Sequence, residues 1–123
     1  MNSKLIIISF VFLCLIPTTV PKSYASSDLA SICLYVAEND KKRLRKLLKS
    51  NHVKIRKLYQ EISCNNKSLL QFAIEKKSKD VGLFMVKKIP VSLLKKKGAL
   101  KWAEDNGHAD SDITAALRKR VGS

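Results

Sequence analysis

The sequence predicts an all-α protein, a short, irregular stack of helical hairpins that follows a signal peptide. Apolar residues recur every three or four positions through most of the chain after residue 25, and polar turns separate these stretches into pairs. No stretch alternates convincingly as a strand. The 123 residues, 46% hydrophobic and 28% charged, have the composition of one small globular domain, which we place at residues 26–123.

Residues 1–25 are expected to form a secretory signal peptide. A short basic lead ending at Lys4 precedes an apolar run, Leu5–Ile16, and Ser23-Tyr24-Ala25 offers small residues for cleavage after Ala25. The apolar run is too short to span about 30 Å of hydrocarbon, so an uncleaved membrane tether is the weaker alternative. The mature protein is therefore expected in the periplasm or outside the cell.

The first predicted hairpin begins with an N-cap in Ser26-Ser27-Asp28 and a helix to about Glu38. After a turn at Asn39-Asp40, a second helix has the apolar stripe Leu44, Leu47 and Leu48, with cations on its other face. An inserted helix is predicted over Val53–Ile62, and a polar run ends it.

The second predicted hairpin covers Ser68–Lys88, with a polar turn at Lys76–Asp80. Pro90 is expected to end it. We interpret Val91–Leu94 as a short apolar connector and Lys95–Gly98 as an exposed turn.

The third predicted hairpin ends the chain. Its first helix carries Trp102 and ends at Gly107, a residue typical of a helix C-terminus. Asp110 or Asp112 is expected to cap the last helix, which carries the apolar residues Ile113, Ala116 and Leu117.

Equivalent segments recur in the three hairpins, at Val36–Asp40, Ala73–Lys77 and Ala103–His108. Ser68-Leu69-Leu70-Gln71-Phe72-Ala73 stands where the ankyrin repeat family has Thr-Pro-Leu-His-x-Ala, and Gly98–His108 looks like the terminal unit of such an array. Over most of residues 28–120 the chain thus resembles a degenerate ankyrin array, in which the inserted helix breaks the 33-residue period. It also resembles a family of small exported gammaproteobacterial proteins whose function is not assigned, which implies no activity.

Two cysteines, Cys33 and Cys64, remain after cleavage of the predicted signal peptide. In an oxidising compartment an isolated pair is most simply interpreted as one disulfide. Two buried free thiols or a redox pair are the alternatives, and the absence of a CxxC spacing disfavours the redox pair.

Little in the sequence indicates catalysis. His52 and His108 are far apart, and neither has a partner at the usual ligand spacing of zinc sites. There is no glycine-rich phosphate loop, and no pair of carboxylates suggests a general acid and base. We therefore predict a protein that is not an enzyme and has no metal or cofactor, with His108 hydrogen bonding within its turn.

Positive charge is the most informative feature for function. The 22 basic and 10 acidic residues after residue 25 give a formal charge of +12, and Lys41–Lys57 holds nine cations and no acid. Repulsion within such a surface lowers stability, which favours a partner of negative charge, although solubility alone is the competing explanation.

The sequence thus predicts a non-catalytic binding module that engages an acidic protein or an anionic envelope polymer through its basic surface. The runner-up is a secreted cationic protein that disrupts membranes, which would need an amphipathic helix free to insert. Nucleic acid is disfavoured because an exported protein seldom meets it, and the sequence predicts no oligomeric state. The predicted binding residues are Lys41, Lys42, Arg43, Arg45, Lys46, Lys49, Lys54, Arg56 and Lys57.

Overall fold

The computed structural model describes residues 26–122, and it confirms the predicted all-α class. The signal peptide predicted at residues 1–25 lies outside the described residues. The helices are α1 (Ser26–Ala37), α2 (Lys41–Ser50), α3 (Ile55–Glu61), α4 (Leu69–Glu75), α5 (Lys79–Lys88), α6 (Val91–Lys97), α7 (Ala99–Asp105) and α8 (Asp112–Val121), and the strands are β1 (Ser63–Cys64) and β2 (Lys67–Ser68).

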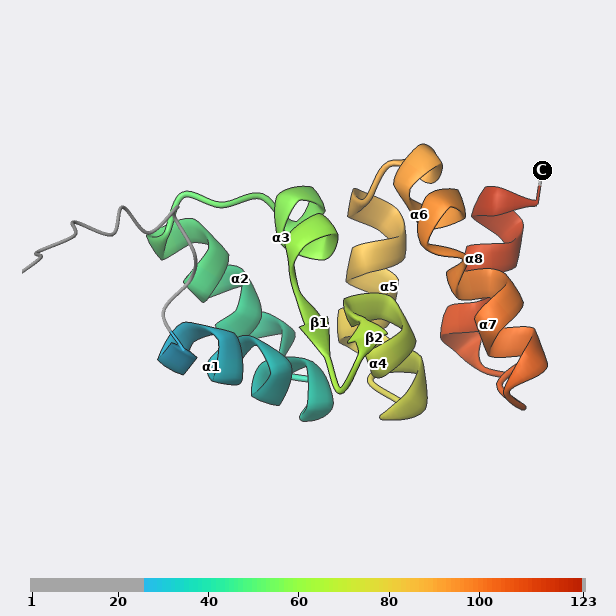
Figure 1. Ribbon diagram of the computed structural model, residues 1–123, viewed down its shortest axis with the longest axis horizontal. Helices are drawn as coiled ribbons and strands as arrows, with labels where there is room; N and C mark the ends of the chain where they lie inside the picture. The colour runs from blue at the N-terminus through green and yellow to red at the C-terminus, as the bar shows by residue number, and fades with distance from the viewer. Residues whose placement is uncertain (1–25, 123) are drawn as a thin grey trace, which may run out of the picture.

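Three helical hairpins, α1–α2, α4–α5 and α7–α8, stand side by side along the long axis of the molecule (Figure 1). The first helices pack in one row, α1 on α4 and α4 on α7, and the second helices pack in another, α2 on α5 and α5 on α8. The core lies between the rows and includes Ile32, Leu44, Leu70, Met85 and Leu117. Because every hairpin buries apolar side chains against its neighbour, the stack forms one continuous core.

Two short helices, α3 and α6, lie along the same edge of the stack (Figure 1). Each follows the second helix of a hairpin and packs on the next hairpin, α3 on α5 and α6 on α7 and α8. The inserted helix predicted over Val53–Ile62 is present as α3. It is not the single extra helix expected, because α6 takes the equivalent place one hairpin later.

The helix α6 also corrects the expected connector at Val91–Leu94 and turn at Lys95–Gly98. Pro90 occupies the N-cap position, where its missing N–H costs nothing, and Leu94 is buried. The helix continues through Lys97 and ends at Gly98, whose φ of 63° is left-handed. Seven residues with only one fully buried side chain are too few for a helical stripe to be recognised in the sequence.

A two-stranded hairpin joins α3 to α4 and contradicts the expectation of no strands. β1 and β2 pair antiparallel, with Ser63 opposite Ser68 and Cys64 opposite Lys67. Asn65 and Asn66 form the turn, with φ angles of 52° and 63°. Asparagine tolerates this conformation, and such two-residue turns match the twist of the paired strands. Strands of two residues are too short to show alternation.

Serine side chains cap α4 and α8. Ser68 and Gln71 form a capping box at α4, in which Gln71 N donates to Ser68 Oγ (3.2 Å) and Ser68 N donates to Gln71 Oε1 (3.1 Å). The expected cap of α8 at Asp110 or Asp112 is wrong, because Ser111 Oγ accepts from Thr114 N (3.1 Å). The N-cap expected at Ser26–Asp28 is wrong as well, because these residues already lie within α1.

Polar contacts between hairpins fix α2 beside α5. The buried Ser78 hydroxyl donates to the Val36 carbonyl of the first hairpin. Asn39, in the turn between α1 and α2, accepts from Val81 N (3.0 Å) with its Oδ1 and so caps α5 from the neighbouring hairpin. The turn of one hairpin thereby sets the position of the next.

Two further links join elements that are distant in the sequence. The structure joins Cys33 of α1 to Cys64 of β1, with their sulfur atoms 2.05 Å apart, as the sequence analysis predicted. At the other end, the Arg120 guanidinium of α8 donates to the carbonyls of Lys87 (3.2 Å) and Ile89 (3.0 Å). Arg120 therefore satisfies carbonyls at the C-terminal end of α5.

Within residues 26–122, no helix has the length and apolarity needed to cross a membrane.

Candidate functional site

The helix α2 separates its charged and apolar residues cleanly. Six of its ten residues are Lys or Arg and none is acidic. Leu44 and Leu48 are buried against the stack, and every cation of the helix is exposed. Asp40 caps the helix by accepting from Arg43 N (3.0 Å). Packing of the leucines thus turns the cations of α2 toward solvent.

Five cations of α2 line one shallow hollow of about 440 Å³: Lys41, Lys42, Arg45, Lys46 and Lys49. Three pairs among them, Lys41/Arg45, Lys42/Lys46 and Arg45/Lys49, are four residues apart on the same helix face. Like charges at this spacing destabilise a helix by roughly 0.2–0.5 kcal/mol a pair. Lys41 and Lys42 also lie at the helix N-terminus, where the helix dipole favours negative charge. This arrangement lowers the stability of α2.

Neighbouring carboxylates do not neutralise these five cations. Among the described residues, the ion pairs of this region are Arg43 with Asp40 (3.4 Å) and Lys57 with Glu61 (4.0 Å), and neither involves the hollow. The other ion pairs within residues 26–122 lie on later elements. The positive charge of the hollow is therefore available to an anion from outside the chain.

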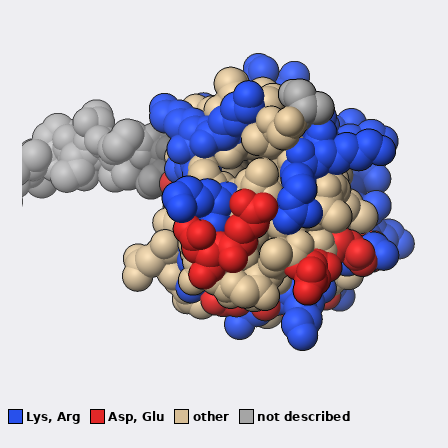
Figure 2. All heavy atoms as spheres, turned by 90° about the vertical axis from the view of Figure 1, so that its right-hand side faces the viewer, with Lys and Arg blue, Asp and Glu red and all other residues tan. Residues whose placement is uncertain are grey.

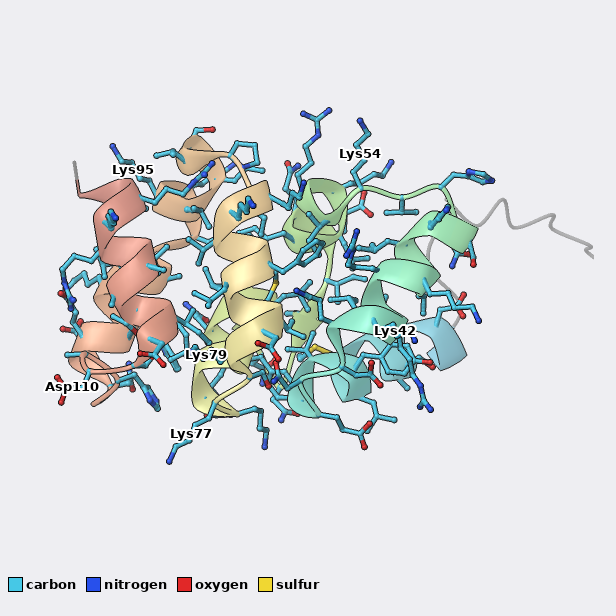
Figure 3. All side chains as sticks on the ribbon, turned by 180° about the vertical axis from the view of Figure 1, so that it is seen from behind. Lys42, Lys54, Lys77, Lys79, Lys95 and Asp110 are labelled. Carbon is cyan, nitrogen blue, oxygen red and sulfur yellow. A yellow bond between two sulfur atoms is a disulfide. The ribbon has the colours of Figure 1, made fainter. Side chains whose placement is uncertain are left out.

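The nine residues predicted to bind do not form a single patch. Lys54, Arg56 and Lys57 lie at α3, and Figure 3 shows Lys54 projecting from one edge of the stack, away from Lys42 on the face of α2. Lys95 of α6 projects from the same edge as Lys54 (Figure 3). The structure thus divides the predicted surface into the basic face of α2 and a separate basic edge at α3.

A groove between α2 and α5 extends the basic face beyond the residues that the sequence predicts to bind. Its volume is about 370 Å³, and its lining comprises Lys41, Arg45, Asp80, Leu83, Phe84, Lys87 and Lys88. The Arg45 guanidinium carbon lies 6.0 Å from the centroid of the Phe84 ring, a cation–π distance. Lys41 and Arg45 belong to both the hollow and the groove, so the two are continuous.

The Phe84 ring packs against the core but is only half-buried, and it contributes to the groove. Stacked hairpins place their second helices side by side, so the outward residues of α5 lie next to those of α2. A run of charge along the chain does not indicate such a pairing.

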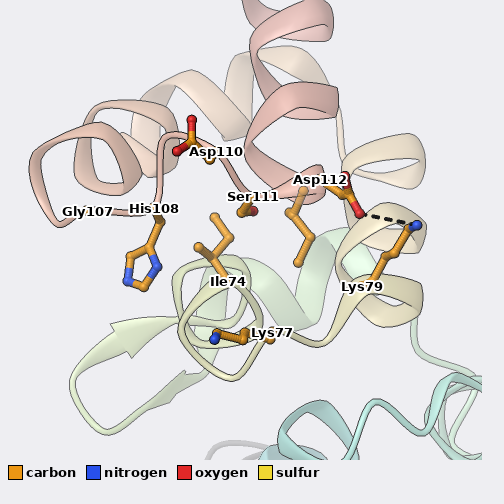
Figure 4. A pocket seen from close by; sticks show the side chains of 9 residues that line it. Ile74, Lys77, Lys79, Gly107, His108, Asp110, Ser111 and Asp112 are labelled. Atoms are coloured by element: carbon orange, nitrogen blue, oxygen red, sulfur yellow. Dashed lines mark ion pairs between the residues drawn. The ribbon is translucent and has the colours of Figure 1, made fainter.

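A second hollow, of about 350 Å³, lies between the turns of the second and third hairpins (Figure 4). Its Lys79 and Asp112 pair with each other (3.2 Å), and the His108 ring stacks on Trp102 with the centroids 5.3 Å apart. His108 N donates to the Ala103 carbonyl (2.8 Å). Residues 26–122 contain no cluster of three or more His, Cys, Asp or Glu side chains suited to a metal ion. The contacts in this hollow serve the packing of the third hairpin.

Acidic side chains gather at the C-terminal end of the stack. Figure 2 shows them on the face of the third hairpin, with Lys and Arg around its rim. Asp105 pairs with Lys101 (2.9 Å) and Glu104 with Arg118 (3.2 Å). The hydrogen bond and charge of Asp105 raise the pKa of Lys101. In contrast to the five cations of the α2 hollow, these two acids have partners within the chain.

Residues 32–96, more than half of the chain, match DUF3718, a family described as a protein of unknown function. The chain belongs to the DUF3718 family. The DUF3718 match contains the disulfide cysteines Cys33 and Cys64, the basic face of α2 and every residue of the α2–α5 groove. Comparison with curated proteins and with solved structures found no match.

Proposed function

We propose that this protein is an exported, non-catalytic binding module that holds an anionic partner, an acidic protein or an anionic envelope polymer, on the basic face of α2. One observation carries the proposal. Five cations line a single hollow without a carboxylate partner among the described residues. An anion bound there relieves the repulsion between like charges on α2, so binding and stability are coupled.

Two other features support this proposal. The disulfide is typical of proteins that work in an oxidising compartment such as the periplasm. We also infer that the hairpins are degenerate ankyrin-like repeats. One support is the capping box, because Ser68 and Gln71 stand where the ankyrin motif has Thr and His. The other is the stacking of the hairpins in two rows of helices, as expected of a repeat array.

Charge reversal on α2 tests the proposal. The triple variant Lys42→Glu, Arg45→Glu, Lys49→Glu should bind poly-L-glutamate at least about tenfold more weakly than the unmodified protein. The matched control is Lys95→Glu, Lys96→Glu, Lys97→Glu, which makes the same change in net charge on α6 and should cause a much smaller loss. Binding of the unmodified protein should also weaken steeply as salt rises.

Titration calorimetry of both variants, with circular dichroism to verify their folding, provides the measurement. A phosphate-rich polysaccharide used in parallel distinguishes an envelope polymer from an acidic protein. Equal losses in the two variants would mean that only net charge matters, and salt-independent binding would reject an electrostatic interface.

The alternative, a membrane-disrupting protein, draws on the amphipathic character of α2. Insertion would require Leu44 and Leu48 to leave the core, in which both are buried. Leakage from anionic vesicles that occurs only after reduction of the disulfide would favour this alternative. Absence of leakage with oxidised and reduced protein would exclude it.

A further inference from the structure

The groove between α2 and α5 differs from the rest of the basic face because it has an apolar floor. We infer that it takes an acidic peptide segment that carries an apolar side chain between carboxylates. This inference rests on the proposed function, and it specifies the partner as a protein segment.

The floor consists of Leu83 and Phe84 on α5. Both side chains are half-buried, although they belong to a helix whose Val81, Met85 and Val86 are fully buried in the core. The floor therefore presents apolar surface at the base of a groove, where a ligand side chain can remove it from water.

The walls supply the charge. Lys41 and Arg45 lie on the α2 side, and Lys87 and Lys88 on the α5 side. Arg45 lies over the Phe84 ring, so its planar guanidinium is held next to the floor, where it can bind a carboxylate in a bidentate manner. Arg120 binds the Lys87 carbonyl (3.2 Å), which fixes the backbone of the second wall.

One acidic residue in the groove discriminates between ligands. Asp80, at the start of α5, is exposed and accepts from Asn39 Nδ2 (3.2 Å). Its charge repels a polymer of uniform negative charge that follows the groove, and such a polymer would leave the floor in water. A flat membrane surface cannot reach a floor set between four long cationic side chains. An acidic peptide suits both the floor and the walls of the groove, because its apolar side chain contacts the floor while its flanking carboxylates reach the walls.

Two synthetic peptides test the inference. One has glutamates on both sides of a single central tryptophan, and the other has serine in place of the tryptophan. The tryptophan peptide should bind the oxidised, unmodified protein about tenfold more tightly. Leu83→Ser and Phe84→Ala should each remove most of that difference. The matched control is Leu34→Ser, an apolar residue of α1 that is 51% exposed and lies outside the groove, and it should change nothing.

Nuclear magnetic resonance of the unmodified protein keeps the test valid if a floor variant fails to fold. The tryptophan peptide should shift the amide signals of Leu83, Phe84 and Arg45. Equal binding of both peptides, with shifts confined to Lys46 and Lys49, would overturn the groove and leave the basic face of α2 intact. Failure of both peptides and of poly-L-glutamate to bind would overturn the inference and the proposed function together.

Discussion

At the scale of single residues, Gly82 sets how closely α5 and α8 approach. A Cβ atom at this position would lie 2.3 Å from Ile113 Cδ1 and 2.6 Å from Ile113 Cγ1, well inside van der Waals contact. Glycine within a helix normally lowers its stability by roughly 1 kcal/mol relative to alanine. Its presence in α5 is therefore explained by packing.

Gly82→Ala should lower the free energy of unfolding by about 1–3 kcal/mol, because overpacking outweighs the gain in helix propensity. Urea denaturation measures the change. Adding Ile113→Ala should make the two losses less than additive, because the smaller side chain leaves room for the new methyl group. A stabilised Gly82→Ala variant would contradict the close packing of α5 on α8.

Burial of Tyr59 gives the protein a specific alkaline sensitivity. Desolvation raises the pKa of Tyr59, whose buried hydroxyl has no hydrogen-bond partner among the described residues. The folded state therefore keeps the phenol proton at a pH where the unfolded chain has lost it. The free energy of unfolding therefore keeps its full contribution from Tyr59 below about pH 10 and falls as the pH rises further.

In Tyr59→Phe, the fall in melting temperature between about pH 9.5 and 11 should be smaller than in the unmodified protein. Tyr35→Phe serves as the control, since it removes a tyrosine that is only partly buried. If the two variants show the same dependence on pH, lysine titration alone explains the alkaline loss.

At the scale of helices and strands, the disulfide links the first hairpin to the segment before the second. Cys33 and Cys64 are 31 residues apart, and closing such a loop stabilises a protein by roughly 3–4 kcal/mol in chain-entropy terms. That is a large part of the total stability expected of a domain of this size, about 5–10 kcal/mol.

Reduction of the disulfide, or Cys33→Ser, should lower the melting temperature by at least about 10 °C. Hydrogen exchange should show α1 and α2 losing protection before α4 to α8, because the lost link belongs to the first hairpin. Reductant should have no further effect on Cys33→Ser, which controls for unrelated effects of the reagent. Mass spectrometry that finds two free thiols in the mature protein would reject the bond.

Helical periodicity sufficed to predict the three hairpins, because each has an apolar stripe long enough to recognise. It failed for α6 and for β1 and β2, because these elements are too short to show a period. Ser111 was missed because two aspartates flank it and all three residue types can cap a helix. Only the fold shows which of them takes that position.

At the scale of the whole molecule, the stacking of the hairpins determines which residues lie together in the candidate site. The run of charge in Lys41–Lys57 correctly marked α2 as basic and exposed. It could not show that α3 faces another edge, or that Phe84 and Lys87 of α5 lie beside Arg45. These juxtapositions join residues about 40 positions apart, and no local pattern encodes them.

Excess positive charge should make the folded protein more stable as salt rises. The whole sequence has a formal charge of +14, and screening weakens repulsion among its exposed cations. We expect the urea midpoint to increase between about 0.02 and 0.3 M sodium chloride. The α2 triple Glu variant should start from a higher midpoint and respond less to salt. A midpoint that falls with salt would mean that ion pairs outweigh repulsion.

The bond between Cys33 and Cys64 also has a topological consequence. It closes a covalent ring that contains all of α2 and α3, and with them nine of the Lys and Arg residues after which a trypsin-like protease cleaves. A single cut within the ring opens it but releases no fragment, because the sulfur atoms still join the two pieces. A nicked molecule therefore retains every residue, with one water added by the hydrolysis, until it is reduced.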